Sequence, residues 1–104
     1  DCVVQGYGGL SFVGHGNGTQ LGAAADRTPS RTPRVVLRPG QRVVSLVAIT
    51  SPYPYDRSTC QRAWADGFRV YVPDSRVAKF VPFRTLTCAN PRLHMLAHKA
   101  YRRP

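Results

Sequence analysis

The chain has 104 residues, a length that suits one domain with a two-layer core and is too short for a core plus a deep catalytic cleft of its own. Its net charge is +10, with 15 lysines and arginines against five aspartates, which favours anionic partners such as nucleic acid, wall polymers or acidic proteins. The nine glycines and nine prolines disfavour helix, and no apolar run has the length that a membrane span needs.

The first quarter of the chain predicts short strands separated by glycine turns. Residues 3–13 begin as a strand, break at a cluster of glycines, and resume as a strand. Residues 14–19 predict a turn, in which Asn17 and Gly18 tolerate the positive φ angles of a tight hairpin. Residues 20–25 return as a short, weak strand.

The next segments predict a surface loop and two strands. Residues 26–34 are polar and carry two prolines, as expected of a loop. Residues 34–37 predict a short strand, and residues 38–41 predict a type II turn with proline and glycine at its centre. Residues 42–50 are the longest apolar run, so we expect a strand that is buried on much of both faces.

The strongest strand pattern lies at residues 67–73. Apolar residues alternate there with Arg69 and Tyr71, while Gly67 opens the strand and Pro73 ends it. Further strands are expected at residues 76–83, and at 93–97. The spacing of strands and turns predicts an all-β, antiparallel sandwich or barrel formed by a single domain, residues 1–104.

The three cysteines, Cys2, Cys60 and Cys88, are far apart and lack the Cys-x-x-Cys spacing of zinc ribbons and thioredoxin-type sites. They fit a small β domain held by one disulfide, with one cysteine left over. His94 and His98 have the i, i+4 spacing of a helical metal site, but a strand would place both on one exposed face, so we expect no metal and no cofactor.

Catalytic motifs are not evident. Neither Cys60 nor Cys88 lies in a nucleophile motif, and the aspartates are scattered turn residues, so the sequence predicts a protein that is not an enzyme.

One candidate binding surface combines aromatic and basic residues on both sides of Cys60. Such a surface stacks on sugars, bases or a protein partner. Its members are Tyr53, Tyr55, Arg57, Arg62 and Trp64. The competing interpretation is that Trp64 packs into the edge of the core while the tyrosines cover one end of the domain. A second candidate is a basic strand face that includes Arg69 and Arg84.

Several motifs in order along the chain resemble the actinobacterial DUF4232 family of secreted proteins and lipoproteins. They are Cys2 ahead of the segments 6–7 and 10–13, Gly18 with the segments 20–22 and 25–27, the turn region 36–41, Cys60 before the strand 67–73, and the pair 87–88 before Leu93. The resemblance implies an exported, disulfide-bonded, immunoglobulin-like β-sandwich without an assigned activity.

The resemblance also bears on the disulfide. Family members have a further cysteine and about two strands before the position matching Cys2, so the sandwich is expected to be incomplete at its N-terminal edge, where another chain could add a strand. If the missing cysteine is the partner of Cys88, then Cys2 pairs with Cys60, which is the pairing we expect; Cys60 with Cys88 is the alternative.

These observations predict a secreted or cell-envelope module that binds a protein or an anionic cell-wall polymer. The alternative is a basic, nucleic-acid-binding β-barrel, which the charge and the exposed aromatics favour.

Overall fold

Short strands alternate with turns along the chain, and the turns carry most of the glycines and prolines. The computed structural model describes residues 2–104. In this range the elements are β1 (Cys2–Val4), β2 (Gly9–Gly14), β3 (Thr19–Leu21), β4 (Asp26–Arg27), β5 (Val35–Leu37), β6 (Val47–Ile49), α1 (Arg57–Cys60), β7 (Arg62–Tyr71), β8 (Lys79–Cys88) and β9 (Leu96–His98). The prediction of an all-β fold is therefore confirmed.

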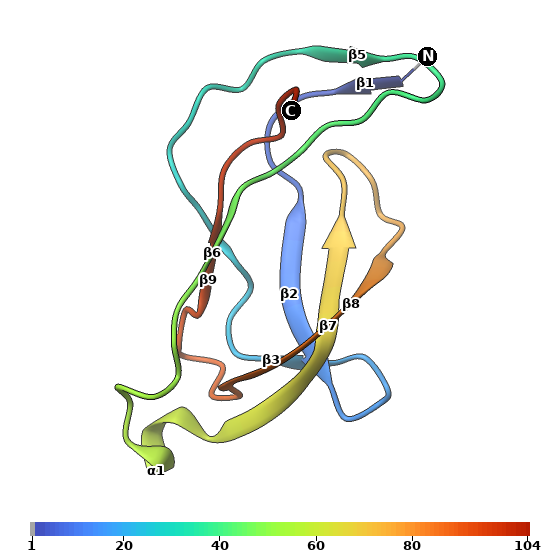
Figure 1. Cartoon of the computed structure of the whole chain (residues 1–104). Helices are drawn as coiled ribbons and strands as arrows, with labels where there is room; N and C mark the ends of the chain where they lie inside the picture. The colour runs from blue at the N-terminus through green and yellow to red at the C-terminus, as the bar shows by residue number, and fades with distance from the viewer. Residues whose placement is uncertain (1) are drawn as a thin grey trace.

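The strands form three sheets (Figure 1). The largest has the order β3-β2-β7-β8, the second has the order β4-β9-β6, and β1 pairs with β5. Among residues 2–104 the pairing of β4 with β9 is parallel and the other strand pairings are antiparallel. The largest sheet contains the strand that the sequence pattern singled out, β7, at an interior position.

The strand β7 is longer than predicted and contains a bulge. Gly67 lies in its middle rather than at its start, so that prediction is wrong. The pairing with β2 jumps from Gly14–Ala65 to Val13–Gly67, which leaves Asp66 as the extra residue. The carboxylate of Asp66 accepts a hydrogen bond from the backbone N–H of Gly16 at 2.8 Å. The β2–β3 turn is thereby tied to the bulge.

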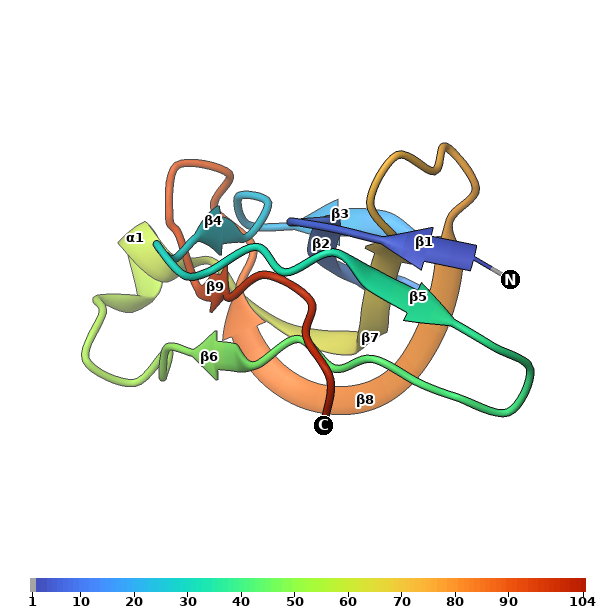
Figure 2. The same ribbon diagram turned by 90° about the horizontal axis from the view of Figure 1, so that it is seen from above.

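The main core lies between the two larger sheets. Phe12, Leu21 and Ala65 come from the four-stranded sheet, and Met95 and Leu96 come from β9 and the residue before it. In Figure 2, the β4-β9-β6 group lies beside the larger sheet, and β8 curves so that its C-terminal end approaches β9. The two sheets therefore share one hydrophobic core.

The longest apolar run of the sequence is not a buried strand. Within residues 42–50, only Val47–Ile49 forms a strand, and Val44 makes an isolated bridge to Arg102. All three residues of β6 are exposed, because β6 is the last strand of its sheet and pairs only with β9. The prediction of burial on both faces is wrong.

Other strand boundaries also differ from the predicted ones. Residues 26–34, predicted as a loop, begin with the two-residue strand β4, and β8 and β9 begin and end later than the predicted strands 76–83 and 93–97. The predicted turn at residues 38–41 is present: the N–H of Gln41 donates to the carbonyl of Arg38 at 3.0 Å, and Gly40 has φ +84°.

Candidate functional site

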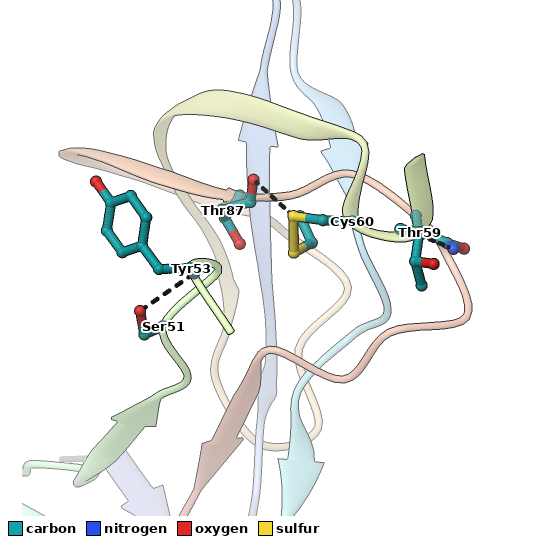
Figure 3. Close-up of a disulfide and its surroundings, with 7 residues drawn as sticks. Ser51, Tyr53, Thr59, Cys60 and Thr87 are labelled. Atoms are coloured by element: carbon teal, nitrogen blue, oxygen red, sulfur yellow. Dashed lines mark hydrogen bonds between the residues drawn. A yellow bond between two sulfur atoms is a disulfide. The ribbon is translucent and has the colours of Figure 1, made fainter. Parts of the chain in front are cut away.

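The disulfide joins Cys60 to Cys88, so the expected pairing of Cys2 with Cys60 is wrong and the alternative is confirmed (Figure 3). Both bonded cysteines are fully buried, whereas Cys2 is exposed and unpaired. The physical reason is the topology. Cys60 ends α1 and Cys88 ends β8 beside it, while β1 pairs with β5 at the opposite end of the molecule (Figure 1).

Backbone contacts fix the chain on both sides of this disulfide. The N–H of Ala89 donates to the carbonyl of Gln61 at 2.9 Å, and the side-chain amide of Asn90 donates to the carbonyl of Thr59 at 2.8 Å. The Sγ of Cys60 lies 4.0 Å from the carbonyl oxygen of Thr87; a bonded sulfur has no hydrogen to donate, so this is a packing contact. The helix α1 is thus fastened to the end of β8.

A shallow groove of about 370 Å³ lies along the second half of β8. Its lining comes from the end of β6 and the loop after it, from β7 and from the second half of β8. The lining residues are Ile49, Thr50, Ser51, Pro52, Tyr53, Trp64, Arg84, Thr85 and Leu86. We call this site the aromatic groove. Figure 3 shows Tyr53 beside the disulfide, with its backbone N–H donating to the hydroxyl of Ser51 at 3.3 Å.

Two aromatic side chains of the groove are exposed, and each is covered by an arginine. Tyr53 is 67% exposed and Trp64 is 55% exposed. The guanidinium carbon of Arg62 lies 5.2 Å from the centre of the Tyr53 ring, and that of Arg84 lies 4.9 Å from the Trp64 ring. These distances are those of cation–π stacking, which holds the long arginine side chains in place.

The structure brings together three of the five predicted binding residues, Tyr53, Arg62 and Trp64. Of the other two, Tyr55 is partly buried against the core, and Arg57 is exposed on α1, outside the groove lining. The interpretation that Trp64 packs into the core edge is wrong, because its neighbours on either side along β7 face the core and Trp64 therefore faces outward.

Arg84 is a groove residue that the sequence does not predict as one, although it belongs to the predicted basic strand face. It lies two residues before Leu86, which is the cross-strand partner of Trp64. Side chains two apart on a strand point to the same face, so Arg84 and Trp64 meet. The sequence carries this signal only once the register between β7 and β8 is known.

The basic residues of the described chain have few acidic partners. Within residues 2–104 the basic side chain that contacts a carboxylate is His94, whose Nδ1 lies 3.0 Å from Oδ1 of Asp26, and neither Arg62 nor Arg84 contacts a carboxylate. The Nε of Arg62 is buried without an acceptor. The positive charges of Arg84, in the groove lining, and of Arg62, stacked on Tyr53, are therefore not neutralised by a carboxylate of the described chain.

His94 and His98, whose spacing in the sequence resembles that of a helical metal site, lie in different environments. His94 is exposed beside Asp26, whereas His98 is buried, and its Nε2 lies 3.2 Å from the carbonyl oxygen of Gly8. The prediction that a strand would expose both is wrong, because β9 begins at Leu96 and turns His98 inward. Burial lowers the pKa of His98 below its ordinary value, and the charge of Arg27 acts in the same direction. Residues 2–104 contain no cluster of three potential metal ligands.

Comparison with known proteins gives a family and no closer relative. In the part of the chain that the structure describes, no helix is both long and apolar enough to span a bilayer. No curated protein and no solved structure matches the chain. The sequence profile described as "Domain of unknown function (DUF4232)" matches residues 1–97, which is nearly the whole chain. The chain belongs to the DUF4232 family.

Proposed function

We propose that this domain is a non-enzymatic binding module of the cell envelope, secreted or attached to the envelope, that recognises an anionic partner through the aromatic groove. The partner is a protein or an anionic cell-wall polymer. The observation that carries the proposal is the pair of exposed aromatic rings, Tyr53 and Trp64, each stacked with an arginine that has no carboxylate partner among residues 2–104.

The stacking preorganises the two arginine side chains for binding. A free arginine loses rotamer freedom when it engages a ligand, but Arg62 and Arg84 are already held against the rings. A guanidinium offers several N–H donors in one plane and matches the oxygens of a carboxylate or a phosphate. Tryptophan, tyrosine and arginine are also the residues that dominate the energy of protein interfaces.

The proposed location rests on the disulfide and on the family resemblance. A buried disulfide between Cys60 and Cys88 forms and persists in oxidising surroundings, which favours an exported protein, and the family resemblance implies an actinobacterial source. We propose that the two facing sheets are an immunoglobulin-like sandwich, a fold that commonly serves as a binding scaffold.

The side chains of the groove suit binding better than catalysis. Its lining includes no carboxylate, histidine or cysteine in the described chain, so a general base to activate Thr50, Ser51 or Thr85 is missing from it. Nucleic acid would also satisfy the charge and the rings, and it is the second candidate because single-stranded bases stack on exposed aromatic side chains.

The test compares three soluble anions, which are a teichoic acid, poly-glutamate and a single-stranded DNA oligonucleotide, by calorimetry at 50 and 200 mM salt. We expect the teichoic acid or poly-glutamate to bind, and Trp64→Ala to weaken that binding at least tenfold. Val77→Ala removes a similarly exposed apolar side chain outside the groove and serves as the control.

Equal affinity of the Trp64→Ala and wild-type proteins would overturn the groove as the site. If DNA binds tightest, with affinity that falls about a hundredfold or more over that salt range, the nucleic-acid alternative replaces the proposal.

A further inference from the structure

Two side chains of β6, Val47 and Ile49, face the core and yet are exposed to solvent. In the register of β6 with β9, Val47 lies opposite His98 and Ile49 lies opposite Leu96. His98 and Leu96 are buried, and residues directly opposite one another in a sheet point to the same face. Val47 and Ile49 therefore point inward, yet they are 42% and 45% exposed.

The strand β8 of the larger sheet also has side chains that face the core and yet are exposed. Phe12 on β2, Phe68 on β7 and Val81 on β8 are opposite one another in register, and Phe12 is buried in the core. The ring of Phe68 stacks on Phe12 at 4.9 Å and on Phe83 at 5.3 Å. Val81 and Phe83 thus belong to the inner face, but they are 45% and 44% exposed.

Between β6 and β8, the two sheets therefore leave an apolar gap open to solvent. We call it the seam, formed by Val47, Ile49, Val81 and Phe83. A cavity of about 190 Å³ lies at its floor and is lined by both sheets. Its lining residues are Gly9, Leu10, Ser45, Val47, Phe68, Val70, Val81, His98 and Tyr101.

The seam is continuous with the aromatic groove. Ile49 lies in the seam and also lines the groove, and so does Thr85, which follows Phe83 as the next inward-facing residue of β8 because it lies opposite the buried Ala65. An extended chain lying along the seam would therefore enter the groove at one end. At the other end it would meet Lys79, the first residue of β8, which pairs with Val70 of the cavity lining.

The backbones on both sides of the seam are also open. The strands β6 and β8 are the last strands of their sheets, so one side of each has hydrogen-bonding groups that no strand of residues 2–104 covers. Pro82 has no N–H to donate, so a strand added along β8 finds no donor at this position, and the amide groups nearest the groove belong to residues 83–86. This stretch adjoins the groove.

We propose, resting on the binding function above, that the partner is a polypeptide that adds an extended strand along β8. Apolar side chains at alternate positions of this strand would fill the seam, and acidic residues would flank them. The acidic flanks follow from charge, because Lys79 lies at one end of the seam and Arg84 at the other. A second copy of this chain carries the same charge of +10 and would be repelled, so the strand comes from a different protein.

The probe is a synthetic peptide in which five valines alternate with threonines between two glutamates at each end. A shuffled peptide of the same composition, with its valines consecutive, tests the alternation, and a peptide with lysines in place of the glutamates tests the charge. Affinity is measured by calorimetry, and the amide hydrogens of residues 83–86 are followed by hydrogen exchange.

We expect the alternating acidic peptide to bind at least tenfold more tightly than either control peptide and to slow exchange at residues 83–86. The double variant Val47→Asp, Val81→Asp should weaken binding at least tenfold, because it places charge in the seam at positions that are already exposed. Val77→Asp adds the same charge at an exposed position outside the seam and should bind as the wild type does.

The outcomes separate this inference from the proposed function. The strand inference is overturned if the alternating peptide does not bind, or if the seam variants bind it as tightly as the wild type does. The groove still stands in that case, provided that the teichoic acid or poly-glutamate binds and that Trp64→Ala weakens this binding. If the seam variants abolish peptide binding and Trp64→Ala leaves all binding unchanged, the strand inference stands and the groove is overturned. If no probe binds, both fail.

Discussion

Cys60 and Cys88 are bonded to each other across 28 positions of the sequence, and their disulfide joins the helix beside the aromatic groove to the end of β8. On the chain-entropy model a closed loop of this length stabilises the fold by about 3–4 kcal/mol. The variant Cys88→Ala should therefore lower the free energy of unfolding by about that amount. Denaturant unfolding of the wild type and the variant measures this difference.

Cys2→Ser is the matched control, because Cys2 is exposed and unpaired, and its stability should equal that of the wild type. Alkylation of the native protein without reductant, followed by peptide mapping, should modify Cys2 alone. Modification of Cys60 or Cys88 under those conditions would contradict the pairing.

Gly67 lies where the backbone of β8 comes close to β7. A Cβ atom at this position would be 2.1 Å from the carbonyl oxygen of Val81 and 2.9 Å from the backbone nitrogen of Phe83. Backbone atoms of a paired strand cannot move aside cheaply, so Gly67→Ala should destabilise the protein by about 1–3 kcal/mol. Thermal unfolding of the purified variant measures the loss.

Gly9→Ala on β2 is the control for this prediction. Its Cβ would meet only the side chain of Tyr71, at 3.1 Å, and a side chain can shift. We expect a smaller loss of stability than at Gly67. An equal loss in the two variants would show that the close backbone approach at Gly67 is not the cause.

The burial of His98 makes the stability depend on pH. Burial lowers its pKa below the ordinary value of 6.5, and Arg27 adds to this, while the Gly8 carbonyl opposes it. The unfolded chain then holds a proton at pH values where the folded protein does not, so stability is greatest above about pH 6.5 and falls as the pH decreases below it. The melting temperature should decrease between pH 7.5 and pH 5.

The variant His98→Gln keeps a side-chain N–H for the Gly8 carbonyl and removes the titrating group. It should flatten this part of the pH profile relative to the wild type. A slope in His98→Gln equal to that of the wild type would assign the pH dependence to other groups.

Local chemistry explains which parts of the fold could be predicted from the sequence. Turn residues and the alternation around Arg69 are local signals, so the strands, the turn at residues 38–41 and the all-β class are predictable. The exposure of residues 47–49 is not, because it depends on which strand ends each sheet. An apolar run looks the same in the sequence whether a neighbouring strand covers it or not.

The residues of the candidate site likewise divide into those that the sequence predicts and those that depend on the strand register. Tyr53, Arg62 and Trp64 could be selected as aromatic and basic residues close together in sequence, and they lie together in the structure. Arg84 comes from another strand, and its place depends on the register of β8 against β7. The disulfide partner of Cys60 was also a question of topology, since the spacing of the cysteines permits either pairing.

The most direct test of the account uses the intrinsic fluorescence of Trp64, the one tryptophan in the sequence, which lies in the aromatic groove with Arg84 stacked on it. The protein is titrated with the teichoic acid, poly-glutamate and the alternating peptide, with calorimetry of the same mixtures to establish which of them bind. We predict that each probe that binds shifts or quenches the Trp64 emission, and that this change saturates with the affinity measured by calorimetry. Calorimetric binding that leaves the Trp64 emission unchanged would contradict the assignment of the groove as the binding site.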